Sequence, residues 1–236
     1  MLDVKDLHAY YGASHVVQGI SFNIDQGEAV ALVGRNGVGK TSTLKSLIGL
    51  ETRVQGSIAL QGTTLVGKPA HVRANRGLGY VPEERAVFPQ MSVEENIRIG
   101  ALLHPGKNQH GVLDRAYELF PILKERRLQL AGTLSGGQQK MLALARGIAL
   151  QPKLLMVDEP TEGLMPANVE LIANALLSAA QGGLTVLVVD SSFDLLRVLC
   201  SRMYAMDRGV LIGTYRPSDF SSPDELAATL LGEGRH

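Results

Sequence analysis

The chain contains one cysteine, Cys200, and no excess of charge of either sign. A single cysteine excludes an intramolecular disulfide and fits a reducing compartment, where we expect Cys200 to be a buried apolar residue. Lysine plus arginine equals aspartate plus glutamate, 23 against 23. Proteins that bind nucleic acids usually have a basic excess or a basic stripe, so we expect no nucleic-acid partner.

Long hydrophobic runs, internal repeats and low-complexity segments are also absent. No apolar run approaches the roughly 18–20 residues that a membrane-spanning helix needs. The N-terminus lacks the order of charged, apolar and small residues that a signal peptide has. The 236 residues, 45% of them hydrophobic, suffice for one large core or for a core with a satellite subdomain. We therefore expect a cytoplasmic globular protein.

Hydrophobic periodicity divides the chain into two kinds of segment. Apolar runs alternate with helical stretches at both ends, which predicts a parallel sheet covered by helices. From Ser92 to about Leu150 the periodicity is helical, and Ser92 and Glu95 form a capping box at its start. The expected strands are 2–4, 21–24, 29–33, 57–60, 78–81, 154–157 and 185–189; the expected helices are 41–50, 166–180 and 193–199, with a hairpin over 203–214 and a terminal helix from 223.

A glycine-rich loop follows the third expected strand. Gly34 to Thr41 reads G-x-x-x-x-G-K-T, and a helix follows it. Glycines permit backbone amides to surround phosphates, and the helix start adds partial positive charge. Lys40 supplies a charge for the outer phosphates, and Thr41 supplies a hydroxyl for Mg²⁺. The alternative, a chance glycine-rich turn, does not explain the strand, loop and helix in this order.

Two carboxylates end the strand that begins at Leu154. Asp158 would hold Mg²⁺ through water, and Glu159 would act as the general base that polarises the attacking water. An Asp-Glu pair alone is more typical of a solvated acidic turn. The phosphate loop upstream favours the catalytic interpretation.

The run Leu134-Ser-Gly-Gly-Gln-Gln139 completes an ordered set of motifs. With the phosphate loop and Asp158-Glu159-Pro160, it resembles the nucleotide-binding cassette of ABC transporters over essentially the whole chain. The resemblance implies an α/β P-loop NTPase fold, with a RecA-like parallel-sheet core, an antiparallel β subdomain and a helical signature subdomain. It implies one domain over 1–236, in which 1–83 and 152–236 form the core and β subdomain and about 84–151 form the helical subdomain.

The resemblance also implies ATP and Mg²⁺ as ligands and a second cassette as partner. Each ATP would lie between the phosphate loop of one chain and the Ser-Gly-Gly segment of the other, whose helix start can face an anion. Tyr11 resembles the aromatic residue that stacks on adenine; Tyr10 competes for this role, with core packing as its alternative. The expected nucleotide-binding residues are Tyr11, Gly34, Arg35, Asn36, Gly37, Val38, Gly39, Lys40, Thr41, Ser42, Ser135, Gly136, Gly137 and Gln138.

Two positions depart from the family pattern. Glu83 follows Val81-Pro82 where the family usually has glutamine, and a carboxylate there can still ligate Mg²⁺ beside Thr41 and Asp158. Ser191 stands where the family has a histidine near the γ-phosphate, and a hydroxyl cannot become cationic. We therefore expect Lys40, Glu159 and Ser191 to form a catalytic set that binds ATP well and hydrolyses it slowly or with help from a partner.

Both departures are typical of one branch of the family. The stretch from Val81 to Asn96 resembles the smaller ATP-binding subunit of bacterial importers for branched-chain amino acids, amides and urea. The resemblance implies a heterodimer of cassettes, with a homodimer as alternative. It also implies permease subunits as partners and a peripheral position on the inner face of the cell membrane. Phe88 and Pro89 would contact the permease or pack within their loop, and Glu162-Gly163-Leu164 resembles the loop that communicates across the dimer.

Two alternatives belong to other functional classes. A soluble ABC ATPase of DNA repair or translation would carry a coiled-coil insertion or a second cassette, and the chain has neither. A regulatory subunit that binds nucleotide without turnover is favoured by Ser191, whereas the intact Lys40, Asp158 and Glu159 favour hydrolysis.

Overall fold

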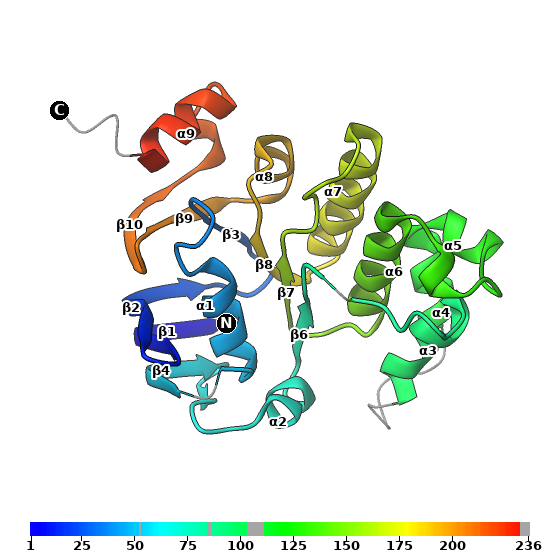
Figure 1. Ribbon diagram of the computed structural model, residues 1–236, viewed down its shortest axis with the longest axis horizontal. Coiled ribbons are helices and arrows are strands. Elements are labelled where there is room, and N and C mark those ends of the chain that lie inside the picture. Colours follow the sequence, from blue (N-terminus) through cyan, green and yellow to red (C-terminus); the bar gives the residue numbers. More distant parts are fainter. Residues whose placement is uncertain (52, 85, 103–110, 232–236) are drawn as a thin grey trace.

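The protein is built around two β-sheets, seen in a computed structural model that describes residues 1–51, 53–84, 86–102 and 111–231 (Figure 1). One sheet is antiparallel with the strand order β2-β1-β4-β5. The other has the order β10-β9-β3-β8-β7-β6 and is parallel except for β10, which pairs antiparallel with β9. The strands are β1 (Leu2–Tyr11), β2 (Ser14–Ile24), β3 (Ala29–Val33), β4 (Arg53–Leu60), β5 (Thr63–Thr64), β6 (Leu78–Val81), β7 (Leu154–Asp158), β8 (Thr185–Val189), β9 (Arg202–Asp207) and β10 (Val210–Tyr215).

The parallel sheet is covered on both faces. Every residue of β3, β7 and β8 is buried, as expected for short apolar strands in the centre of an α/β sheet. Successive side chains alternate between two hydrophobic clusters, so that Ala31 faces one and Leu32 faces the other. Because the central strands are parallel, the loops that follow their carboxyl ends meet at one edge of the sheet.

The helices pack around the two sheets. Helix α1 packs against the antiparallel sheet, whereas α7 and α8 cover the opposite face of the parallel sheet, and α3 to α6 lie together at its β6 end (Figure 1). The helices are α1 (Lys40–Ile48), α2 (Ala70–Asn75), α3 (Val93–Leu102), α4 (Val112–Leu119), α5 (Pro121–Glu125), α6 (Gly136–Ala149), α7 (Pro166–Gln181), α8 (Phe193–Leu199) and α9 (Pro223–Leu231), with single 3₁₀ turns at Ala131–Thr133 and Pro217–Asp219. Within the described ranges, no helix combines the length and the apolar character that crossing a bilayer requires.

The predicted fold class is confirmed, including the parallel core, the antiparallel sheet and the helical segment. The capping box at Ser92 is also present, because the Ser92 amide donates to Glu95 Oε2 at 2.7 Å and the Glu95 amide donates to Ser92 Oγ at 3.2 Å. The first two strands are longer than predicted, since bulges let β1 and β2 continue through polar residues. The prediction missed α2, because a helix of six residues is too short to show a detectable hydrophobic period. The boundaries proposed for the subdomains stay a prediction.

Asn96 holds the segment between β6 and α3 in place. It is fully buried, its Oδ1 accepts from the Phe88 amide at 2.8 Å, and its Nδ2 donates to the carbonyls of Phe88 and Ser92 at 3.0 Å each. We expect Asn96→Leu to lower the free energy of unfolding by about 2–4 kcal/mol, because buried polar partners lose their hydrogen bonds. Urea denaturation measures this, with Asn174→Leu on the exposed side of α7 as the matched control. Equal free energies of unfolding for the two variants would contradict the stabilising role of the Asn96 hydrogen bonds.

Candidate active site

At two positions, the loop between β3 and α1 has a backbone conformation that only glycine tolerates. Gly34 has φ +153°, and a Cβ built on it would lie 2.2 Å from the carbonyl oxygen of Met206. Gly39 has φ +110° immediately before α1, and its Cβ would lie 3.0 Å from the carbonyl oxygen of Val16. The loop therefore passes close to two other segments, with its amides at the start of α1.

Lys40 is the charged group at the centre of this loop. Its side chain is only 5% exposed, and its ammonium donates to the carbonyl oxygens of Gly34 at 2.9 Å and Arg35 at 3.0 Å. The same nitrogen lies 3.7 Å from Glu159 Oε1, so the lysine joins the loop to the end of β7. A phosphate in the loop would meet this ammonium together with the helix start.

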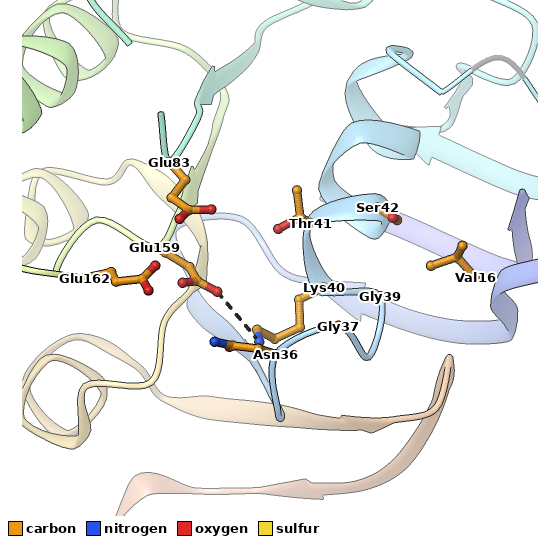
Figure 2. A pocket seen from close by; sticks show the side chains of 10 residues that line it. All are labelled: Val16, Asn36, Gly37, Gly39, Lys40, Thr41, Ser42, Glu83, Glu159 and Glu162. Atoms are coloured by element: carbon orange, nitrogen blue, oxygen red, sulfur yellow. Dashed lines mark ion pairs between the residues drawn. The ribbon is translucent and has the colours of Figure 1, made fainter. Parts of the chain in front are cut away.

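A cavity of about 310 Å³ opens beside Lys40. Figure 2 shows that residues of the loop and of α1 face three carboxylates across it. Six of the predicted phosphate-loop residues line this cavity, whereas Gly34, Arg35 and Val38 do not. The lining residues are Val16, Asn36, Gly37, Gly39, Lys40, Thr41, Ser42, Glu83, Glu159 and Glu162.

Asp158 lies at the end of β7, where two hydroxyl groups donate to it. Thr41 Oγ1 donates to Oδ1 and the Tyr80 hydroxyl donates to Oδ2, each at 3.1 Å. Burial raises the pKa of Asp158, and the hydrogen bonds from Tyr80 and Thr41 oppose that rise. Burial, followed by the charge of Asp158, likewise raises the pKa of Tyr80 above its ordinary value, so the phenol stays a donor.

The predicted metal ligands Thr41, Asp158 and Glu83 fit a magnesium ion by their chemistry. They offer a hydroxyl and two carboxylates, the hard oxygen ligands that Mg²⁺ prefers. Thr41 and Asp158 already lie within hydrogen-bond distance, and Thr41 and Glu83 line the same cavity. The assignment of these three residues stays a prediction.

Glu159 points into the cavity because its backbone turns sharply. Its φ is +44°, unusual for a residue other than glycine, and its amide donates to the Val189 carbonyl at 2.7 Å. This turn explains how Asp158 and Glu159, neighbours in sequence, both reach the edge where Lys40 lies. Strain at such a residue is common at functional sites, where the surrounding contacts hold the conformation.

Three glutamates, Glu83, Glu159 and Glu162, share the cavity wall, and one carboxylate oxygen from each lies within 4.8 Å of the other two. Burial, then hydrogen bonding to Glu162, raises the pKa of Glu159 to about 7, although Lys40 opposes the rise. The pKa of Glu83 is raised by burial and by Glu162, whereas hydrogen bonds from Glu159 and Glu83 lower the pKa of Glu162. A carboxyl group with a pKa near neutrality is matched to take a proton from water at physiological pH.

Sequence reasoning missed Tyr80 and Glu162 as members of this site. Glu162 was predicted only as part of a communicating loop, yet it lines the cavity beside Glu159. Spacing from Glu159 could have indicated it, since residues three apart across a turn approach one another. Tyr80 is the one residue with a polar tip in a strand of apolar or small residues. A tyrosine in such a strand indicates a buried phenol that needs a hydrogen-bond partner.

The Ser-Gly-Gly segment lies outside this cavity, at the exposed start of α6. The Gln138 amide donates to Ser135 Oγ at 3.3 Å, and the Ser135 amide donates to Gln138 Oε1 at 3.2 Å, which closes a capping box. A Cβ at Gly136 would meet no atom within 4 Å, whereas one at Gly137 would lie 2.7 Å from Asn168 Nδ2. The helix start is therefore open to an external ligand on the side of Ser135 and Gly136.

The two tyrosines that end β1 lie in different environments. Tyr10 stacks on His15 with ring centroids 4.4 Å apart, and the Arg53 guanidinium carbon lies 4.3 Å from the centre of the Tyr10 ring. Tyr11 is 73% exposed and therefore presents its ring to solvent. Tyr11 does not line the phosphate cavity, although Val16 of the adjoining strand β2 does. This arrangement favours Tyr11 for stacking on a base, and the role stays a prediction.

Ser191 lies beside the phosphate loop but outside the phosphate cavity. It lines a smaller, mostly apolar cavity of about 120 Å³ together with Gly34 and residues of α8 and α9. The preceding residue, Asp190, is buried and accepts from Thr161 Oγ1 at 2.7 Å and from the Thr161 amide at 3.0 Å. The aspartate thus holds the loop that follows Glu159, and the serine next to it is exposed.

We expect Ser191→His to raise the turnover number for ATP by at least about tenfold, because a donor near the γ-phosphate would stabilise charge that develops in the transition state. Steady-state phosphate release measures the effect, and Ser191→Ala is the matched control that adds no imidazole. No gain over the alanine variant would show that the missing histidine does not limit turnover.

Comparisons with known proteins identify the family to which the chain belongs. The family model described as ABC transporter matches residues 17–162. The chain is 36% identical over 212 residues to the high-affinity branched-chain amino acid transport ATP-binding protein BraG of Pseudomonas aeruginosa, covering 90% of this chain and 91% of that protein. It is 31% identical over 234 residues to the lipopolysaccharide export system ATP-binding protein LptB of Escherichia coli, covering 98% and 97%.

A solved structure of the ATP-binding subunit of an ABC transporter superposes with a TM-score of 0.85 at 26% identity, covering 98% of this chain and 99% of that one. The chain therefore belongs to the ABC transporter family, as a cassette that binds and hydrolyses ATP.

Proposed function

We propose that this chain energises a bacterial-type importer for branched-chain amino acids or related amides. The observation that carries the proposal is Glu83: a carboxylate follows Val81-Pro82 and lines the phosphate cavity, where the wider family usually has glutamine. The branch of importers that the sequence resembles has glutamate at this position. The match to BraG, at 36% identity over 90% of the chain, supports the same branch.

In the proposed mechanism, ATP binding draws two cassettes together. The β- and γ-phosphates would occupy the loop around Lys40, and Ser135 and Gly136 of a second cassette would cover them. The open space around Gly136 and the exposure of Ser135 support this division of the site between two chains. Hydrolysis removes the shared anion, and the two cassettes separate.

Glu159 would orient the attacking water and take its proton. Its carboxylate faces Lys40 across the cavity, and its raised pKa suits a base at neutral pH. Magnesium held by Thr41, Asp158 and Glu83 would neutralise charge on the phosphates. Lys40 stabilises the same charge from the loop side.

In the transporter the second cassette would be a different chain, because the branch pairs two different cassettes with two different membrane subunits. When this chain is purified alone, two copies of it would pair in the same way. The segment around Phe88 would receive a membrane subunit: Phe88 is 47% exposed, and the Arg146 guanidinium carbon lies 5.4 Å from its ring centre. The chain would then lie at the inner face of the cell membrane, without entering it.

A second candidate function is supported by a specific observation. LptB, a lipopolysaccharide export protein, matches 98% of this chain at 31% identity. A cassette of an exporter would keep the same hydrolytic site, so only the membrane partner and the direction of transport distinguish the two.

Transport measured in proteoliposomes tests the proposal. The chain is reconstituted with its partner cassette and membrane subunits in vesicles loaded with leucine or urea, with the cassettes outside. We expect added ATP to move solute out of the lumen, toward the cassettes, and Glu159→Gln in this chain to slow that movement. Movement of lipid-linked saccharide away from the cassettes would support the exporter instead. A rate of ATP hydrolysis that neither the solute nor the membrane subunits change would contradict both transport functions.

A further inference from the structure

Lys140 connects the signature helix to the turn that carries the candidate base. The residue lies on α6, five positions after Ser135. Its ammonium donates to the carbonyl oxygens of Glu159 and Glu162, each at 2.8 Å. One charged donor thus bridges the two ends of the turn.

The turn itself is weakly closed. The Glu162 amide lies 3.4 Å from the Glu159 carbonyl oxygen, long for a hydrogen bond within a turn. The two bonds from Lys140 are shorter and charge-assisted, so each is the stronger interaction. On the other side, Thr161 binds Asp190, and the Glu159 amide binds Val189. The turn is therefore held between the end of β8 and α6.

Lys140 does not line the phosphate cavity and acts on it only through the turn. The direction of the Glu159 carboxylate depends on a backbone at φ +44°, which neighbouring contacts must maintain. Both carbonyls that Lys140 holds belong to residues whose carboxylates line the cavity. A shift of this turn by a fraction of an ångström would move Glu159 relative to the attacking water.

We propose that Lys140 is a positioning residue for ATP hydrolysis: by holding the main-chain carbonyls of Glu159 and Glu162, it sets where the Glu159 carboxylate points. Because Ser135 caps the helix on which Lys140 lies, the same contact ties the base of a chain's own site to the helix start that would meet the partner's nucleotide. The inference rests on the proposed role of Glu159 as the base.

The first test compares Lys140→Met with Lys153→Met in the full chain, at ATP concentrations that saturate turnover by the wild-type protein. Lys153 is a matched control, since its ammonium also links two segments, by a 2.6 Å bond to Gln61 Oε1, away from the cavity. We expect Lys140→Met to lower kcat by about ten- to hundredfold, the range for small misplacements of a catalytic group, and to leave the Kd for ATP unchanged. The control should alter neither.

Conservative variants separate positioning from folding. Lys140→Arg retains a cationic donor and should recover most of the lost kcat, whereas Lys140→Gln, a shorter neutral donor, should recover less. Thermal unfolding identifies any variant that fails to fold. A loss of kcat that the arginine variant shares in full, a parallel loss of ATP affinity, or an unchanged kcat in Lys140→Met would each overturn the proposal.

A double-mutant cycle tests whether Lys140 acts through Glu159. In the Glu159→Gln background we expect Lys140→Met to cause no further loss of the residual turnover. The same fold-loss in both backgrounds would show that Lys140 acts independently of Glu159 and would overturn the inference. If Glu159→Gln alone leaves turnover intact, the assignment of the base fails instead, and the two failures are distinguishable.

Discussion

Glu159→Gln is expected to lower the turnover number for ATP hydrolysis by about 100- to 10,000-fold, the range attributed to general base catalysis, while ATP binding is retained. Glutamine keeps the length and shape of the side chain and cannot accept a proton. The backbone at φ +44° should accommodate it as it does glutamate, because the strain belongs to the main chain. Binding should persist because Lys40 and the loop amides are unchanged.

Loss of the carboxylate should also change the lifetime of the ATP-bound dimer. If hydrolysis is what separates two cassettes, the glutamine variant should remain dimeric with ATP and elute earlier in size-exclusion chromatography. Single-turnover phosphate release gives the rate, and Glu118→Gln on the exposed surface of α4 is the matched control. Undiminished phosphate release in Glu159→Gln would remove Glu159 as the base.

Lys40→Ala is expected to weaken ATP binding severely and to abolish detectable turnover. The lysine is 5% exposed, and truncating a buried charge that faces an opposite charge costs about 2–5 kcal/mol. A loss of that size corresponds to a reduction in affinity of about 30-fold to more than 1,000-fold. The loop amides and the start of α1 would remain, which is why some weak affinity for phosphate is expected at high concentration.

The matched control for this prediction is Lys124→Ala, which removes an exposed lysine from α5. Because the Lys40 ammonium also donates to Gly34 and Arg35, a second variant, Lys40→Met, keeps most of the packed stem. Fluorescent ATP titration with both variants measures the affinity, and circular dichroism checks the fold. Wild-type affinity in either variant would contradict the phosphate-loop assignment.

Local sequence context predicted the strand, loop and helix around Lys40. A buried strand, a glycine-rich loop and a helix are consecutive in the chain, so Lys40 and Thr41 could be placed from their neighbours alone. Asp158 could be placed for the same reason, because its strand pairs with β8 in the parallel sheet and ends at the same edge.

Contacts between distant segments escaped sequence reasoning. The Tyr80 hydroxyl reaches Asp158 from the neighbouring strand, and the local sequence pattern of β6 does not identify Asp158 as its hydrogen-bond partner. Lys140 reaches Glu159 across the interface between a helix and a turn, which periodicity does not reveal. Ser191 lines an apolar cavity beside Gly34 of the phosphate loop, and this cavity depends on how α8 and α9 pack, which local sequence does not reveal.

Steady-state ATP hydrolysis by the purified chain with Mg²⁺, over a wide range of chain concentrations, tests the central claim most directly. The claim is that one cassette completes the site of another and that Glu159 performs the chemistry. Turnover per chain should rise with concentration toward a plateau and should fall by at least about 100-fold in Glu159→Gln at every concentration. Turnover per chain that is independent of concentration, or that survives in the glutamine variant, would contradict the account.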